Sequence, residues 1–253
     1  MTASPTNWHT VAFGPIAVDR DSLVLLLQHL FSRSPGRVEL THLTRGDREL
    51  VGAVAERCGY MVRGTTMRRT ATVSGAESFD EYLGRRDRRR LRRLDDARRH
   101  LEAQGCLDLV VHSRSETLSS AVEEFLALEQ RGWVVESGLP ILADNTTAVF
   151  YRDIAAWAAE VGVLSVAFLQ LDGRSIAGTL CIEDHRSTFA LRSAFEPATG
   201  LGPVLILQLD LIRLSLAQGR DYELTGEALP YRMNWADETR DLTRIALRPG
   251  KRR

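Results

Sequence analysis

The sequence contains little cysteine and almost no lysine. Its three cysteines, Cys58, Cys106 and Cys181, are widely separated and lack metal-ligand spacing, so we predict no metal site and free, structural thiols. Lysine occurs once, at Lys251, and the other basic residues are arginine. Thirty-three basic and 33 acidic residues give a formal net charge of zero. A general affinity for nucleic acid therefore does not follow from composition.

Long apolar runs and targeting patterns are also missing. The most apolar stretch, residues 203–216, is shorter than the roughly 20 residues of a membrane span and is interrupted by polar side chains. Residues 1–7 lack the charged-then-apolar pattern of a secretion signal. We therefore expect a cytoplasmic protein without membrane contact. With 253 residues and 44% apolar content, the chain can form one large domain or two small ones.

Apolar periodicity predicts alternating helices and strands along the chain. The expected helices are 21–33, 47–58 and 79–104, followed by two amphipathic helices around 118–126 and 150–161. The expected strands are 38–43, 60–73 and 107–111, and then 163–171, 176–183 and 187–195, which turns at 172–173 and 184–186 join into an antiparallel meander. Alternation in the last strand predicts one face with Phe189, Leu191, Ser193 and Phe195, and another with Thr188, Ala190, Arg192 and Ala194.

A glycine-opened helix follows the meander. Pro203 suits its first turn and Gly219 its end, and a strand at 221–225 completes a parallel crossover. Gly200 and Gly202 leave the helix N-terminus open, so its N–H groups and dipole can bind phosphate, although the two glycines also suit a simple turn. Leu205 stands where a dinucleotide fingerprint needs a third glycine, and no Gly-Lys-Ser/Thr is present, which excludes both nucleotide motifs.

The helix expected at 79–104 is strongly basic. Residues Arg85 to Arg99 contain nine arginines and three aspartates, a net charge of 9 − 3 = +6. Such a run is compatible with a solvated helix. It also suits contact with a polyanion, such as tRNA or a nucleotide-bearing cofactor, because arginine binds phosphate bidentately.

The order of these elements, and the segment Glu223-Leu-Thr-Gly-Glu-Ala-Leu-Pro-Tyr-Arg-Met-Asn-Trp235, resemble the CelD-like and FemAB-like branch of the GNAT acyltransferases. In that signature an acidic strand precedes Gly, a polar pair, Tyr-Lys and an aromatic residue, and Arg232 replaces the lysine here. The resemblance implies an α+β fold with a mixed sheet, antiparallel meander plus parallel crossover, flanked by helices. It covers about residues 77–247, and we predict residues 77–253 to be the acyltransferase domain. Residues 1–76 resemble a shortened N-terminal GNAT half-repeat.

The resemblance further implies N-acyl transfer from acyl-CoA, of the acetyl-CoA class, to a small-molecule or peptide amine. The donor's pyrophosphate would bind at Thr199, Gly200, Leu201, Gly202, Pro203 and Val204, and its pantetheine arm at Ser193, Ala194 and Phe195. No Ser-His-Asp or Cys-His constellation is recognisable, which agrees with direct transfer. Trp133, Arg192 and Arg232 are the predicted substrate-binding residues.

Acid and base come from the segment after the last strand. Glu227 and Tyr231 lie four residues apart and would share a face on a helical turn. The resemblance further implies a general acid at a tyrosine just beyond this strand, so we predict Tyr231 as general acid and Glu227 as general base, directly or through water. Two alternatives stay open: transfer from aminoacyl-tRNA, with tRNA contacting Arg85 to Arg99, and a non-catalytic GNAT-like binding module. The shortened half-repeat would leave a sheet edge open, and a homodimer would cover it.

Overall fold

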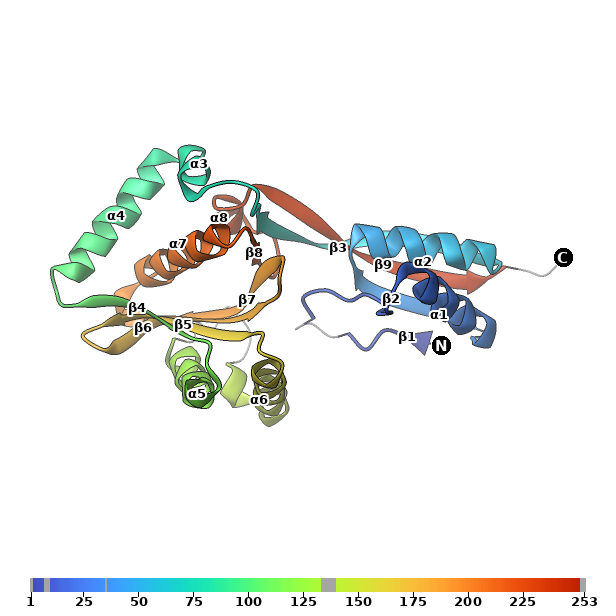
Figure 1. Cartoon of the computed structure of the whole chain (residues 1–253), viewed down its shortest axis with the longest axis horizontal. Coiled ribbons are helices and arrows are strands. Elements are labelled where there is room, and N and C mark those ends of the chain that lie inside the picture. Colours follow the sequence, from blue (N-terminus) through green and yellow to red (C-terminus); the bar gives the residue numbers. More distant parts are fainter. Residues whose placement is uncertain (1, 7–9, 35, 133–139, 251–253) are drawn as a thin grey trace. The chain divides into compact units, whose positions relative to one another are not determined.

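The computed structural model describes residues 2–6, 10–34, 36–132 and 140–250, which form two compact units (Figure 1). Unit 1 comprises Met1–Ala71, Gly226–Met233 and Glu238–Arg253, and unit 2 comprises Thr72–Thr225 and Asn234–Asp237. The end of the chain thus belongs to unit 1, although the sequence placed it in the second domain. The interpretation of unit 1 as a half-repeat stays a prediction.

Unit 1 is a small sheet covered by two helices. Its elements are β1 (Thr2–Ala3), α1 (Arg20–Arg33), β2 (Val38–Leu43), α2 (Arg45–Arg57), β3 (Tyr60–Val73), α8 (Pro230–Met233) and β9 (Glu238–Pro249). The strand order is β1-β2-β9-β3, with the last residues of β3 belonging to unit 2. Asp19 and Thr44 accept hydrogen bonds from the first turns of α1 and α2, so both helices begin at side-chain caps. Their apolar faces pack on β2 and β9 around Leu27, Val51 and Ile245.

Strand β9 was not predicted from the sequence. It pairs antiparallel with β2, with Val38 opposite Leu247 and Leu40 opposite Ile245. On its other side β2 is partly covered by β1, through the pairs Thr2–Val38 and Ala3–Glu39. The edge that a homodimer was expected to cover therefore has a partner from the same chain, and the homodimer stays a prediction.

Unit 2 contains the meander and the crossover, as predicted. Its elements are α3 (Phe79–Gly84), α4 (Arg88–Glu102), β4 (Leu107–His112), α5 (Ser115–Arg131), η2 (Ile141–Ala143), α6 (Asn145–Glu160), β5 (Leu164–Leu171), β6 (Arg174–Glu183), β7 (Ser187–Phe195), η3 (Pro197–Thr199), α7 (Gly202–Ala217) and β8 (Asp221–Leu224). The strand order is β8-β7-β6-β5-β4, with β4 to β7 antiparallel and β8 parallel to β7. Helix α7 lies on one face of this sheet, and α5 and α6 lie on the other (Figure 1).

Two local expectations were wrong. The basic helix is two helices, because Arg85 ends α3 and the Asp87 side chain caps a new helix by accepting from the N–H groups of Arg89 and Arg90. The alternation of β7 is broken by a bulge, since Leu180 pairs with Arg192 and the next residue, Cys181, pairs with Ala190. Phe189 and Arg192 consequently face the same side, with the bulge at Leu191.

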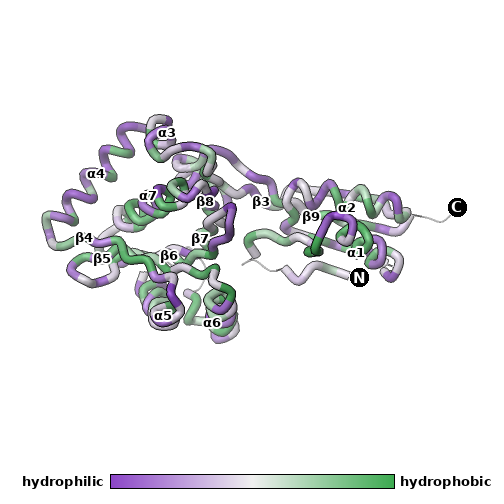
Figure 2. Tube along the Cα trace, viewed as in Figure 1, coloured by the Kyte–Doolittle hydropathy of each residue, from purple (hydrophilic) through white to green (hydrophobic). Residues whose placement is uncertain are grey.

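Helix α7 carries one buried acid in its apolar surface. Asp210 is 6% exposed, and its Oδ2 accepts a hydrogen bond of 2.6 Å from Nη2 of Arg98 on α4. Arg213 lies farther away, at 3.6 Å from Oδ1. The hydrophilic stretches of α4 contrast with the apolar strands of the same unit in Figure 2. The ion pair between Arg98 and Asp210 therefore fixes α4 against α7.

Among the described residues, no helix has the length and apolarity to cross a membrane.

We predict that Arg98→Ala lowers the free energy of unfolding by about 2–3 kcal/mol, because Asp210 stays buried without its main partner. Arg98 is partly exposed, which keeps the effect below that of a fully buried pair. The double variant Arg98→Leu with Asp210→Leu should recover most of the loss, since both charges are removed together. Urea unfolding followed by circular dichroism measures both. Equal destabilisation of the single and double variants would contradict this account.

Candidate functional site

Strands β7 and β8 stand at one end of the strand order of unit 2 and diverge along their length. They pair at Ser187–Asp221, Thr188–Tyr222 and Phe189–Glu223, and the pairing ends there. Strand β7 nevertheless continues to pair with β6 up to Phe195. At the point of divergence, Oγ1 of Thr225 donates to the carbonyl of Ala190. We call this opening, between residues 190–195 of β7 and the end of β8, the β7–β8 fork.

The fork exposes backbone hydrogen-bonding groups. Ser193, Ala194 and Phe195 have β6 on one side and no strand on the other among the described residues. Such an open edge can pair with an extended amide-containing chain. These are the residues predicted to bind the pantetheine arm, and the structure gives them the edge that this role requires. The role itself stays a prediction.

The loop after β7 leads directly into α7. Its first part is a tight turn, in which the N–H of Thr199 donates to Glu196 and that of Gly200 to Pro197, at 3.0 and 3.2 Å. Gly200 has a φ of 69°, which favours glycine. The N–H groups of Leu201, Gly202 and Val204 have no acceptor among the described residues, and no side chain caps the helix. Three donors at a positive dipole end can hold an anion.

Helix α4 lies beside this loop. A Cβ atom at Gly202 would lie 3.5 Å from the Cβ of Ala97, so Gly202 faces α4 across an ordinary van der Waals distance. Several arginines of α4 and of the turn before it are neutralised: Arg85 and Arg86 by Asp237, Arg98 by Asp210, and Arg99 by Asp95 and Asp96. Five others, Arg88, Arg89, Arg90, Arg92 and Arg93, are exposed and form no salt bridge within the described part of the chain. They form what we call the α4 arginine surface.

The Arg192 side chain lies on the α5 face of the sheet, where a carboxylate of α5 holds it. Its Nη2 and Nε donate to Oε1 of Glu129 on α5 at 2.7 and 3.2 Å, and Glu129 is 4% exposed. Oε2 of Glu129 accepts from the N–H of Ile141 at 2.9 Å. Tyr151 lies near this pair, and burial raises the pKa of its hydroxyl. Arg192 is thus a fixed part of the wall on the α5 side, and its predicted contact with substrate stays untested.

Glu223 belongs to the family motif at 223–235, but the sequence did not predict it as a site residue. It is 6% exposed, and its Oε2 accepts a 2.7 Å hydrogen bond from Oγ1 of the fully buried Thr72. It stands at the last β7–β8 pair, opposite Phe189. The available signal was an acid inside the short strand Asp221-Tyr-Glu-Leu, which is unusual for a buried strand.

The predicted acid and base belong to unit 1. Tyr231 lies on α8, is 52% exposed and stacks under the Arg232 guanidinium, 5.4 Å from the ring centre. Nη1 of Arg232 donates to the backbone carbonyl of Glu227 at 2.9 Å. Because α8 begins at Pro230, the shared helical face expected for Glu227 and Tyr231 is wrong. Glu227 is exposed, and the catalytic roles of both stay predictions. Trp133 lies outside the described residues.

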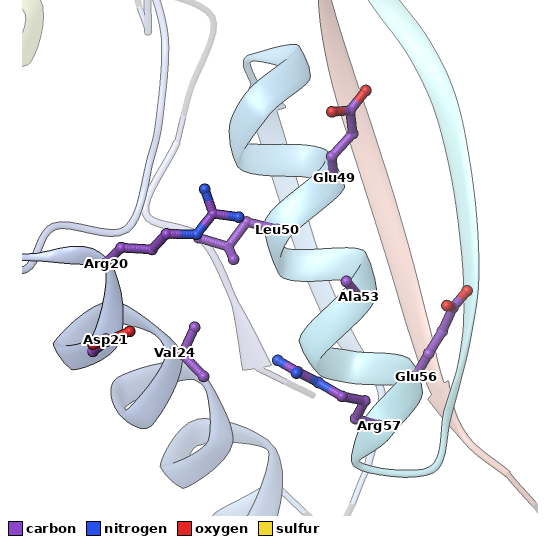
Figure 3. Close-up of a pocket in the computed structure, with 8 residues that line it drawn as sticks. All are labelled: Arg20, Asp21, Val24, Glu49, Leu50, Ala53, Glu56 and Arg57. Atoms are coloured by element: carbon purple, nitrogen blue, oxygen red, sulfur yellow. The ribbon is translucent and has the colours of Figure 1, made fainter.

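A groove of about 770 Å³ separates α1 from α2 in unit 1 (Figure 3). Val24, Leu50 and Ala53 line it together with charged residues of both signs, Arg20, Arg57, Asp21, Glu49 and Glu56. In Figure 3 the side chains of Arg20 and Arg57 extend over the space between the helices. None of the predicted site residues lines this groove. Within the described residues, no cluster of His, Cys, Asp and Glu is arranged for a metal ion.

Comparison with known proteins agrees with this geometry. A protein of unknown function from Bacteroides thetaiotaomicron superposes with a TM-score of 0.62 at 10% identity, over 89% of this chain and 75% of the other. The C-terminal domain of a putative lysylphosphatidylglycerol synthetase from Agrobacterium fabrum gives 0.60 at 11% identity, over 90% and 73%. FemX gives 0.59 at 11% identity, over 89% and 76%. At such identities these likenesses show the fold, and a search of curated proteins finds no match.

The family is shown by the sequence itself. The model of the acetyltransferase (GNAT) domain matches residues 86–233, more than half of the chain, and the matched region contains α4, the β7–β8 fork and the loop that opens α7. The α+β fold with its mixed sheet, predicted from the order of elements, is thereby confirmed. The chain therefore belongs to the GNAT acetyltransferase family and is an acyltransferase of that fold.

Proposed function

We propose that the protein transfers an acyl group from acyl-CoA to an amine by direct attack. The observation that carries this proposal is the continuity of two open backbone elements in unit 2. The free edge of β7 at Ser193–Phe195 is followed, after one tight turn, by the N–H groups of Leu201, Gly202 and Val204, which have no acceptor among the described residues. An acyl-CoA has an extended amide arm followed by a pyrophosphate, in the same order. The arm would pair with β7 and the pyrophosphate would receive the N–H groups of α7.

The chemistry needs no covalent enzyme intermediate. The amine attacks the thioester carbonyl, a proton leaves the nitrogen, and the C–S bond breaks with protonation of the thiolate. The site therefore needs one proton acceptor and one proton donor. The family resemblance and the sequence give Tyr231 the role of donor, and Glu227 that of acceptor. The acceptor substrate would be a small-molecule or peptide amine, with Trp133, Arg192 and Arg232 proposed to contact it.

The anion site is tested by placing a carboxylate at Leu201, whose side chain is 62% exposed. We predict that Leu201→Glu weakens acetyl-CoA binding at least tenfold, because the carboxylate repels the pyrophosphate and competes for the same N–H groups. Its melting temperature should be unchanged or higher, since an acid at a helix N-terminus is favourable. Isothermal titration calorimetry and thermal unfolding measure the two effects.

Leu201→Gln is the matched control, because it changes size and polarity without charge. We expect it to keep acetyl-CoA affinity within about threefold, roughly 0.65 kcal/mol. Equal affinity of the Glu and Gln variants would show that no phosphate binds at this helix. A chain that binds acetyl-CoA yet transfers nothing to any amine would instead support the non-catalytic binding module.

Transfer from aminoacyl-tRNA is the second candidate, and the α4 arginine surface favours it. Five exposed arginines that form no salt bridge with any described residue lie on the helix that contacts the donor loop at Gly202. A polynucleotide donor would use such a surface because arginines bind phosphates bidentately and release counterions. This candidate keeps the same loop and fork and changes only the carrier of the acyl group.

We predict that the triple variant Arg89→Gln, Arg92→Gln and Arg93→Gln lowers the salt dependence of tRNA binding by about three units of log–log slope, one per lost phosphate contact. Filter binding at several salt concentrations measures it. Arg99→Gln is the control, because Asp95 and Asp96 already neutralise Arg99. If the unmodified protein retains no tRNA at low salt, the tRNA candidate is removed and acyl-CoA stays.

The acid role is tested with Tyr231→Phe, which removes only the hydroxyl. Since Tyr231 is half exposed, we expect little change in stability and a loss of about 10²-fold in turnover, as for a lost general acid. The measurement is single-turnover release of free CoA, so that the chemical step is observed. Wild-type turnover in this variant would assign the tyrosine a structural role only.

A further inference from the structure

A pocket of about 310 Å³ lies in unit 1, between β3 and the segment that leads into α8. Its lining residues come from two stretches of the chain, residues 66–69 and residues 227–229. The volume is at the lower end of the range for small-molecule sites, about 300–1,000 Å³. One lining residue is Glu227, the proposed base, and the proposed acid Tyr231 follows four residues later. A pocket at this position can bind the acceptor of the reaction.

The wall of the pocket before α8 is fixed by hydrogen bonds within unit 1. The N–H of Ala228 donates to the carbonyl of Arg69 on β3 at 2.7 Å. The carbonyl of Glu227 accepts twice, from the N–H of Leu229 at 2.8 Å and from Nη1 of Arg232 at 2.9 Å. These bonds use backbone groups of the segment and leave its side chains available. The pocket is therefore formed by the fold itself.

Two side chains of opposite charge in this pocket form no salt bridge with any described residue. Arg69 is paired with Asp241 at 3.0 Å, whereas the neighbouring Arg68 is half-buried and has no such carboxylate. Burial and, after it, the charge of Arg68 lower the pKa of His42, as expected for an uncompensated cation. The Glu227 carboxylate is likewise unpaired within the described part of the chain. Arg68 and Glu227 thus line one pocket without pairing with each other.

The pocket also has an apolar part. Met67 and Leu229 line it and are 46% and 41% exposed. A ligand with an apolar group would remove these side chains from water, and methionine adapts to groups of different shape. A guanidinium such as that of Arg68 matches a carboxylate with two parallel hydrogen bonds. The lining therefore fits a ligand with a carboxylate, an amine and an apolar side chain.

We propose that this pocket binds the acceptor and that the acceptor is an α-amino acid with an apolar side chain. The proposal rests on the proposed function and narrows its acceptor class. Arg68 binds the carboxylate of the amino acid, Glu227 binds its amine, and Met67 and Leu229 contact its side chain. A peptide N-terminus has no carboxylate at this distance from its amine, so it would leave Arg68 unpaired.

The same arrangement serves the chemistry. The amine, once solvent has deprotonated it, attacks the thioester carbonyl carbon and gives a proton to Glu227. The C–S bond breaks, Tyr231 protonates the thiolate, and water carries the proton from Glu227 back to Tyr231. The products are an N-acyl amino acid and free CoA. Glu227 follows Thr225 by two residues, a chain length of about 7 Å at most, and Thr225 bonds Ala190 at the fork.

The test measures binding to the whole protein without acetyl-CoA, by isothermal titration calorimetry. The probes are L-leucine, leucinamide, which lacks the carboxylate, and isocaproate, which lacks the amine. We expect leucine to bind at least about tenfold more tightly than either analogue, because each analogue leaves one charged side chain unpaired. Arg68→Gln should abolish the preference over leucinamide, and Glu227→Gln should abolish the preference over isocaproate.

Arg63→Gln is the matched control, because Arg63 is an exposed arginine of the same strand that does not line the pocket. It should keep both preferences. The melting temperature of Arg68→Gln should stay close to wild type, since no salt bridge is lost. L-methionine is titrated beside leucine, and binding of neither amino acid to the wild type would overturn the proposal.

Acetyl transfer to the same compounds, followed by mass spectrometry, separates this proposal from the proposed function. Leucine that binds through Arg68 but is not acetylated would refute the proposed function and leave the amino-acid site in place. Acetylation of leucinamide with the same kcat/KM as leucine, unchanged in Arg68→Gln, would overturn the site and leave the proposed function. If both proposals hold, Arg68→Gln raises KM for leucine at least about tenfold and leaves KM for leucinamide unchanged.

Discussion

The candidate site depends on the short parallel pairing between β7 and β8, which ends while β7 continues. Strands β7 and β8 share three pairs, ending at Phe189 and Glu223, while β7 continues along β6 to Phe195. A sheet whose strands paired along their full length would leave no backbone groups for a ligand. Because α7 begins a few residues after β7, the open edge and the open helix N-terminus lie on either side of one short turn, and among the described residues both retain backbone groups without a partner.

Buried charges on both sides of the sheet hold these backbone groups in place. On one side, Arg98 and Asp210 join α4 to α7. On the other, Glu129 joins Arg192 of β7 to α5 and to the N–H of Ile141. Each carboxylate is nearly inaccessible to water, so removing either partner leaves an uncompensated charge. The pairs therefore fix the direction of helices and of the bulged strand more than they add net stability.

The arginines of α4 and of the turn before it divide into two classes. Arg85, Arg86, Arg98 and Arg99 are neutralised by carboxylates, whereas the α4 arginine surface keeps its charge in solvent. A chain with zero net charge can therefore still present a local positive field. That field lies on the helix that contacts Gly202, so it would act on the phosphate end of either donor.

Sequence alone determined the local elements and the family. Capping residues such as Asp19, the turn at Asp172-Gly173 and the glycine-opened helix are encoded within a few neighbouring residues, and the meander and the crossover followed from them. The cap at Asp87 is also encoded locally. The helical pattern of the arginines on both sides nevertheless led to the prediction of one continuous helix.

Only the tertiary structure decided which distant segments meet. The pairing of β9 with β2 joins the end of the chain to its beginning, and no local pattern specifies that partner. The bulge at Leu191 reverses the facing of Phe189, because one extra residue shifts the two-residue period of a strand. The position of Glu223 at the fork required both strands and Thr72, which lies far away in sequence. The sequence specifies the chemistry of each side chain. Its burial and its orientation depend on contacts between distant segments, and the local sequence pattern does not specify which segments pair.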